Sequence, residues 1–342
     1  MIARIPARRQ AGMLRTRVRV QKYLPKIMKK KYSIGIGLNL FDARAILLGP
    51  DRKIILEIEK PRKNISANET IKVLLELFEE IISKAKDYKK EEIEGVGLAL
   101  GGIVNTKKGM VYWPQKQYTS YAYISLPLKE YLEKKFNFPV TIENDANSCV
   151  LAEYLLNFPE YKNIIYMFSG VGCGIVSDGK LYRGRDGGAG ELFLNSTKRM
   201  ESDLGNFSFL RQWPIDLGIV KKAKEIISLG KNTSLIKRIT PTGELHLKDI
   251  FEESGKKDKV SRDVLKEASF SLGVKISFLM NLLNPEVVII GGGLEEAGEF
   301  FLDECVDAIK EFSFSEMRKG CKIVFSQLGK SATSLGAALA II

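Results

Sequence analysis

The order of predicted strands and helices occurs twice along the chain, and this duplication constrains the fold more than any single motif. The first copy reads as three strands, a helix, a strand, a helix, a strand and a helix, at 33–38, 43–48, 53–57, 71–82, 95–100, 128–136, 138–142 and from 145 on. The second copy has the same order, with strands and helices at 163–168, 174–177, 180–183, 265–283, 287–290, 298–312, 322–325 and from 332 on. An insert at 184–261 interrupts it. Two copies of one α/β unit predict two lobes with a ligand cleft between their strand ends.

Charge divides the chain into an arm and a body. Residues 1–31 hold eleven Lys and Arg and no Asp or Glu, which leaves 42 basic and 41 acidic residues beyond them. We therefore predict a basic arm at 1–31, a small lobe at 32–150, and a large lobe at 151–342 whose last helix packs back on the small lobe.

Three interpretations of the arm stay open. It is a DNA contact, the remnant of a DNA-binding domain that neutralises phosphates; a disordered, solvated tail; or translated sequence upstream of a start at Met28. The arm is too short for a complete winged domain with three helices.

Composition favours a globular cytoplasmic protein with no membrane partner. No apolar run reaches the roughly 20 residues of a membrane span, and the N-terminus lacks the apolar block of a secretory signal. The cysteines are scattered and the chain has one histidine, His246. We therefore predict small buried side chains rather than disulfides or a zinc site, at Cys149, Cys173, Cys305 and Cys321.

The stretch from Glu143 to Asn147 (ENDAN) lies where a predicted strand meets a predicted helix. Ligands of open α/β sheets bind at such strand ends. There the Asp145 carboxylate can take a proton from a substrate hydroxyl, while the Asn144 amide holds that hydroxyl. The alternative is that Asn144 and Asp145 only cap the helix, since both residue types favour that position.

Two glycine-rich turns follow strands in the second copy. Glycine lets the backbone approach a ligand and direct N–H groups at anionic oxygens, so the turns predict a nucleotide site. The alternative is that glycines serve the sterics of tight turns. The candidate nucleotide-binding residues are Ser169, Gly170, Gly172, Gly174, Gly291, Gly292 and Gly293.

The stretch from Gly179 to Glu191 (GKLYRGRDGGAGE), taken together with ENDAN, resembles the ROK family of sugar kinases and sugar-responsive repressors. The resemblance covers residues 32–342 and implies the duplicated ribonuclease-H-like fold of actin and hexokinases. It implies that Asp145 is the base for the sugar hydroxyl that attacks ATP, and that Asn144 and Glu191 bind the sugar. Gln115, where the family commonly has Asn, and Gly102 complete the predicted sugar site. A homodimer or homotetramer is also implied.

The chain departs from the family pattern in its first phosphate turn, which normally reads Asp-x-Gly-Gly-Thr. Residues 37–41 read Gly-Leu-Asn-Leu-Phe instead, so the acid that positions magnesium is absent, and Leu40 and Phe41 put bulk where phosphate oxygens need room. Phosphoryl transfer depends on positioning and charge neutralisation, so this loss predicts weak catalysis.

A second departure concerns zinc. Leu194 stands near the family's His position, and residues 195–209 contain no cysteine. We therefore expect no structural zinc and no other metal site.

The sequence favours a sugar-binding transcriptional regulator of sugar metabolism with weak or lost kinase activity. The alternative is an active sugar kinase that uses Mg-ATP, with Asp145 as its base. A sugar-binding protein with neither activity is a third possibility.

A chain that starts at Met28 tests the arm. We expect it to bind duplex DNA more weakly than the full chain in an anisotropy titration. The slope of log affinity against log salt should become shallower by about 0.9 for each phosphate that the arm neutralises. Unchanged affinity would identify the arm as a solvated tail.

Overall fold

The structure is a computed structural model that describes residues 31–38, 41–61, 67–88, 92–116, 121–170, 172–192 and 216–341. The first copy of the unit comprises β1 Tyr32–Leu38, β2 Asp42–Leu48, β3 Ile54–Pro61, α2 Ala67–Lys84, η2 Ala85–Asp87, β4 Ile93–Leu100, β5 Ile103–Asn105, β6 Met110–Lys116, β7 Tyr121–Leu126, α3 Leu128–Phe136, β8 Val140–Asn144 and α4 Asp145–Leu156.

The second copy begins at residue 164 and contains the insert. Its elements are β9 Ile164–Phe168, β10 Gly172–Ser177, β11 Lys180–Leu181, α6 Ile219–Ser228, η5 Ser234–Arg238, α7 Leu247–Gly255, α8 Lys259–Leu283, β12 Val287–Gly291, η6 Leu294–Ala297, α9 Glu299–Phe312, α10 Ser315–Arg318, β13 Lys322–Phe325, η7 Gly329–Ser331 and α11 Ala332–Leu339.

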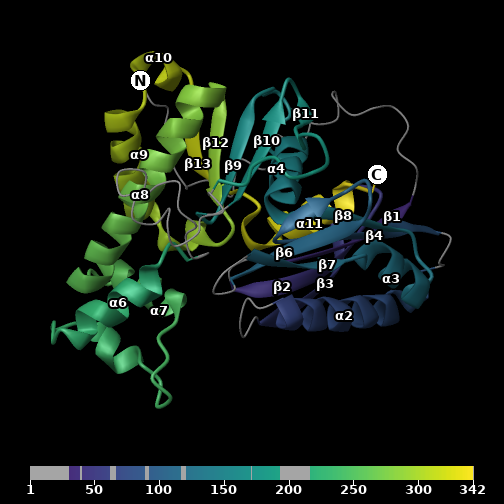
Figure 1. The fold of residues 1–342 in the computed structure, drawn as a ribbon, viewed down its shortest axis with the longest axis horizontal. Helices are drawn as coiled ribbons and strands as arrows, with labels where there is room; N and C mark the ends of the chain where they lie inside the picture. The colour runs from purple at the N-terminus through teal and green to yellow at the C-terminus, as the bar shows by residue number, and fades with distance from the viewer. Residues whose placement is uncertain are drawn as a thin grey trace.

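Each copy builds one five-stranded sheet (Figure 1). The strand orders, β3-β2-β1-β4-β8 and β11-β10-β9-β12-β13, correspond position by position. In both sheets the first two strands pair antiparallel, and the first strand also pairs parallel with the strand that follows the helix. The duplication predicted from the sequence is confirmed.

The outer face of each sheet is covered by helices of its own copy. Ile34 and Ile36 of β1 pack with Phe78 of α2 in the core of the first copy. Helices α8 and α9 cover the second sheet in the same way, on the side away from the first sheet (Figure 1). Side chains alternate along each strand, so the inner faces need their own cover.

That cover comes from α4 and α11, which lie between the two sheets (Figure 1). Helix α4 follows the last strand of the first sheet but packs on β9 and β10 of the second. Helix α11 follows the last strand of the second sheet and packs back on β1 and β4 of the first. The two helices also contact each other, so each copy completes the other's core.

Glycines bring these layers close together. A Cβ atom built on Gly97 of β4 would lie 1.9 Å from the Ala337 carbonyl oxygen of α11. One built on Gly336 of α11 would lie 1.8 Å from the Ser148 carbonyl oxygen of α4. Both separations are far below van der Waals contact, so no larger residue fits either position without backbone movement.

A third sheet, β5-β6-β7, covers residues for which the sequence analysis predicted no strand. Proline lacks the N–H that a central strand donates, so Pro114 is unusual within a sheet. In the structure β5 pairs only with Met110–Tyr112 of β6, so Pro114 has a neighbour on one side, Tyr123 of β7. At such an edge proline is tolerated.

The four cysteines are buried and free, as predicted. Within the described ranges, every helix is too short or too polar to cross a lipid bilayer. The domain boundary predicted at residue 150 falls inside α4, which contacts both sheets, and the division into two domains stays a prediction.

Gly97→Ala tests the packing of α11 on the first sheet. We expect it to lower the free energy of unfolding by about 1–3 kcal/mol, because the added methyl group overpacks the contact with Ala337. Urea denaturation measures the change. Gly255→Ala is the control, since nothing lies within 4 Å of the methyl group that alanine would add there. Equal losses of stability in the two variants would show that α11 does not lie close to Gly97 in solution.

Candidate functional site

The turn from β8 into α4 positions Asn144. Its Oδ1 accepts hydrogen bonds from the backbone N–H groups of Ala146 at 2.9 Å and Asn147 at 3.2 Å, so Asn144 is the N-cap of α4. Its Nδ2 donates to the Gly102 carbonyl at 3.2 Å. Capping is therefore a real role of Asn144. Ligand binding stays compatible with it, because an amide nitrogen has two hydrogens to donate.

Asp145 begins α4 and lies beside the turn that follows β4. Its side chain is 9% exposed, and Oδ1 accepts the Ala146 N–H at 2.8 Å. A Cβ built on Gly101 would lie 3.2 Å from Asp145 Oδ2, so the glycine turn borders the carboxylate directly. Strands β4 and β8 are parallel neighbours, with Leu100 opposite Asn144, and this pairing brings Gly102, Asn144 and Asp145 together.

Glu191 reaches the same place from the second copy. It forms an antiparallel bridge with Gly172, and the neighbouring Gly190 carbonyl accepts the Cys173 N–H at 3.0 Å. Burial, together with the negative charge of Asp145, raises the pKa of Glu191 to about 7. The bridge to Gly172 brings Glu191 toward the start of α4, since a Cβ built on Gly172 would lie 3.4 Å from the Ala146 Cβ. The shared sugar-binding role of Asp145 and Glu191 stays a prediction.

A partly buried ion pair joins the two copies next to these residues. Glu143 is 3% exposed, and its Oε2 accepts a hydrogen bond from Arg183 Nε at 2.6 Å. Its Oε1 accepts from the Asn144 N–H at 2.9 Å and from Asn147 Nδ2 at 3.1 Å. The Arg183 carbonyl in turn accepts the Gly187 N–H at 3.0 Å. Glu143 therefore connects the Asn144 cap to the loop that carries Glu191.

The sequence analysis did not assign Glu143 or Arg183 a role. Glu143 lies in the first stretch that carried the family resemblance and Arg183 in the second. Their opposite charges are the sequence feature that could have suggested an ion pair. Pairing could not be inferred because 40 residues separate them.

The loop leading to Glu191 also packs on β5 of the first copy. A Cβ built on Gly187, whose φ is +111°, would lie 2.1 Å from the Val104 carbonyl oxygen. Lys107 Nζ donates to the Arg185 carbonyl at 3.0 Å. Glycine is needed at residue 187 both for its backbone conformation and for this close approach.

The two glycine turns of the second copy adjoin each other. Strands β9 and β12 are parallel neighbours with Phe168 opposite Gly291, and the Ser169 N–H donates to the Gly291 carbonyl at 3.0 Å. Ser169 Oγ lies 3.4 Å from the Gly292 carbonyl, and the Gly293 N–H donates to Glu295 Oε2 at 2.8 Å. The turns are thus brought together, while their nucleotide-binding role stays a prediction.

Gly172 and Gly174, predicted in the first turn, lie in β10, and Gly174 has a steric explanation. A Cβ built on Gly174 would lie 2.1 Å from the Ala146 carbonyl oxygen, whereas one on Gly172 would meet the Ala146 Cβ at an ordinary contact distance of 3.4 Å. Gly174 lets α4 pack closely on β10. The alternative weighed in the sequence analysis therefore accounts for Gly174 without a ligand.

Lys275 of α8 lies beneath the first turn and was not anticipated. It is 2% exposed, and its Nζ donates to the Gly170 carbonyl at 2.9 Å. Burial lowers the pKa of Lys275 to about 8. The amine fixes the turn through Gly170, and only tertiary structure could reveal this contact.

The start of the first phosphate turn has no room for the acid of the family pattern. A Cβ built on Gly37 would lie 2.7 Å from Thr333 Cγ2 and 2.8 Å from the Ser334 nitrogen, so α11 leaves no room for an acid there. In the ranges that the structure describes, no three His, Cys, Asp or Glu side chains are grouped to hold a metal. Asn39 and Leu40 lie outside those ranges.

Three further predictions also fall outside the described residues. They concern the basic arm, the Gln115 side chain, and the missing zinc motif at Leu194 and residues 195–209.

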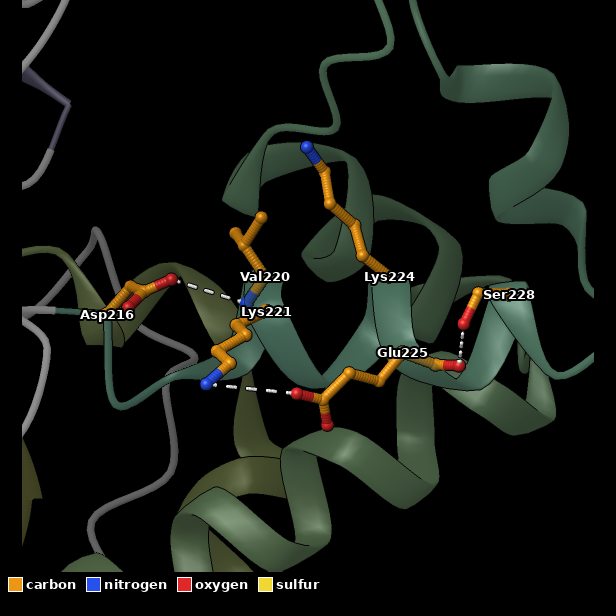
Figure 2. Close-up of a pocket in the computed structure, with 6 residues that line it drawn as sticks. All are labelled: Asp216, Val220, Lys221, Lys224, Glu225 and Ser228. Atoms are coloured by element: carbon orange, nitrogen blue, oxygen red, sulfur yellow. Dashed lines mark hydrogen bonds and ion pairs between the residues drawn. The ribbon is translucent and has the colours of Figure 1, made fainter.

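A separate hollow lies on the surface of α6 (Figure 2). The polar side chains that line it interact with nearby residues of the same segment. The Asp216 carboxylate accepts the Val220 N–H at 3.2 Å, and Lys221 Nζ lies 3.9 Å from Glu225 Oε1. None of the predicted site residues lines it. The candidate site is therefore the one around Asp145.

Glu191→Gln tests the buried carboxyl group. Between pH 4.5 and 7 the unfolded chain has released this proton while the folded protein retains it, so stability falls as pH rises through that window. Glutamine cannot ionise. We therefore expect the variant to be more stable than the parent protein by about 1–3 kcal/mol at pH 8, and to lose that advantage near pH 4.5.

Calorimetric melting at both pH values measures this difference. The exposed Glu130→Gln on α3 is the control and should change stability little at either pH. A stability difference for Glu191→Gln that does not vary with pH would contradict the raised pKa.

Comparisons with known proteins agree with this architecture. The chain is 29% identical over 322 residues to a xylose repressor of Caldicellulosiruptor bescii, covering 90% of this chain and 77% of that protein. It is 28% identical over 253 residues to a glucokinase of Halalkalibacterium halodurans, covering 72% and 76%. Among solved structures, a ROK family glucokinase from Streptomyces griseus in complex with glucose and AMPPNP superposes with a TM-score of 0.70 at 22% identity, covering 90% of this chain and 98% of that one. This likeness confirms the duplicated actin- and hexokinase-like fold.

The model of the ROK family matches residues 32–342, and the chain belongs to that family.

Proposed function

We propose that this protein binds a sugar around Asn144, Asp145, Glu191 and Gly102 and acts as a transcriptional regulator of sugar metabolism. Phosphoryl transfer is weak or lost. The relatives include both a repressor and a glucokinase, so family membership alone does not choose between these functions.

The contact between Gly37 and α11 carries the proposal. In the family pattern an acid at this position holds the magnesium, and here its side chain would collide with Thr333 and Ser334. A nucleotide could therefore not be neutralised in the usual way, and charge neutralisation is central to phosphoryl transfer. The sugar residues, by contrast, retain donors and acceptors suited to hydroxyl groups.

Regulation would follow from sugar binding between the copies. A ligand that contacts Asn144 in the first copy and Glu191 in the second stabilises the arrangement that brings them together. The relative orientation of copies, or of subunits in a homodimer or homotetramer, would then change DNA binding, with the basic arm as a DNA contact.

Sugar binding is tested by thermal stabilisation with a panel that includes D-xylose, D-glucose and N-acetyl-D-glucosamine. At about 100 times its Kd the cognate sugar should add about 2.7 kcal/mol of stability. Asn144→Ser keeps the helix cap but removes the amide donor, and Glu191→Ala removes the carboxylate. We expect both variants to lose most of the stabilisation.

The control is Asn232→Ser in an exposed loop, which should respond like the parent protein. Full stabilisation of the Asn144 and Glu191 variants would show that the sugar binds elsewhere.

An active sugar kinase is the second candidate. The adjoining turns at Ser169 and Gly291 and the position of Asp145 beside Glu191 favour it. Incubation with Mg-ATP and the same sugars distinguishes the two: we expect no ADP release above that of Asp145→Asn. Release that depends on Asp145 would make the kinase the main function.

A further inference from the structure

Phe41 connects the turn after β1 to the second copy. Its ring packs against the core of the second copy and meets Phe251 of α7 edge to face, with ring centroids 6.2 Å apart at 82°. Edge-to-face pairs of this kind stabilise beyond the apolar area that they bury. The family pattern has a small polar residue here, so this contact follows from the departure at residues 37–41.

Lys330 strengthens the same contact. Its Nζ lies 5.6 Å from the Phe41 ring centroid and 2.7 Å from Glu296 Oε1. The Glu296 carboxylate raises the pKa of Lys330, so the amine stays charged at neutral pH. Glu296 belongs to η6, directly after the glycine turn at Gly293, and Lys330 belongs to η7, directly before α11. The contact therefore joins the first phosphate turn to the glycine turn of the second copy.

Besides the packing of α4 and α11, two groups of side-chain contacts between the copies matter here. One lies beside the sugar residues, where Glu143 binds Arg183. The other lies at the first phosphate turn, where Phe41 meets Phe251 and Lys330. In a protein that uses a nucleotide, phosphates must reach this second place, which here carries the Phe41 ring and the ion pair of Lys330 with Glu296.

We propose that Phe41, Phe251, Lys330 and Glu296 form a latch that ties the two copies together at the phosphate end of the predicted cleft and excludes a nucleotide from it. Phe41 thereby adds a steric barrier to the loss of the acid at Gly37. The contacts that form the latch are present in the protein without any ligand. Only its consequence, that sugar alone sets the orientation of the copies, rests on the proposed function.

Phe41→Ala tests the latch in the full chain without sugar. We expect hydrogen exchange of the amides of α7 and η6 to accelerate by about fivefold, the effect of losing one aromatic pair. We also expect Mg-AMPPNP to bind Phe41→Ala at least about tenfold more tightly than the parent protein in calorimetric titration, because the truncation removes the bulk at the phosphate turn.

Phe270→Ala is a matched control. Phe270 pairs with Phe312 at 5.7 Å and the same 82° angle, but both residues lie in the second copy. This variant should leave the exchange of α7 and the binding of Mg-AMPPNP unchanged. Phe41→Leu provides a milder change if the alanine variant does not fold, and it should shift both measurements in the same direction.

Two results would overturn the latch. One is exchange at α7 that is identical in the parent protein and the Phe41 variants. The other is a parent protein that binds Mg-AMPPNP as tightly as those variants do. Neither result depends on sugar, so a failure here is distinct from the failure of sugar binding at Asn144 and Glu191.

Discussion

The close packing of α4 and α11 between the two sheets is the constraint on which the rest of the structure depends. Gly35 and Gly97 let α11 lie directly on the first sheet, with hypothetical Cβ atoms 2.0 Å and 1.9 Å from its carbonyl oxygens. Gly174 lets α4 lie equally close to the second sheet, and Gly336 brings the two helices together. Because each helix leaves one sheet to cover the other, the start of each helix lies where the copies meet. Asp145 begins α4 and Lys330 closely precedes α11, so the contacts around Glu143 and around Phe41 follow from this packing.

Buried carboxylates secure the same region. Glu153 of α4 is fully buried, and its Oε1 accepts hydrogen bonds from Ser326 Oγ at 2.6 Å and from the backbone N–H groups of Gln327 at 2.8 Å and Leu328 at 3.1 Å. It thereby fastens the end of α4 to the segment that leads into α11. Burial raises the pKa of Glu153, and these donors oppose that shift. Removing any one hydrogen-bond donor from a buried carboxylate destabilises the folded protein. The donors around Glu143 and Glu153 therefore hold both ends of α4 in defined positions.

The structure also relates the loss of the phosphate turn to the packing of the fold. An acid at residue 37 would not be a simple addition, because α11 occupies the space that its side chain needs. The bulky Phe41 is likewise not an isolated change, since its ring has partners in α7 and η7. The predicted sugar residues and the predicted nucleotide turns lie at different strand ends, so one set can be retained while the other is lost. This separation explains how repressors and kinases can share one fold.

The duplication, the order of most strands and helices, and the strand-end positions of Asn144, Asp145 and both glycine turns could be predicted from sequence alone, because periodicity and turn residues are local properties. The sheet β5-β6-β7 could not, since Pro114 is acceptable only where a neighbouring strand ends. The pairing of Glu143 with Arg183, the amine of Lys275 beneath Gly170, and the contact of Phe41 with Phe251 were decided by tertiary structure alone. Each joins residues far apart in the chain, and a charge or an aromatic ring does not reveal its partner until the fold brings the two together.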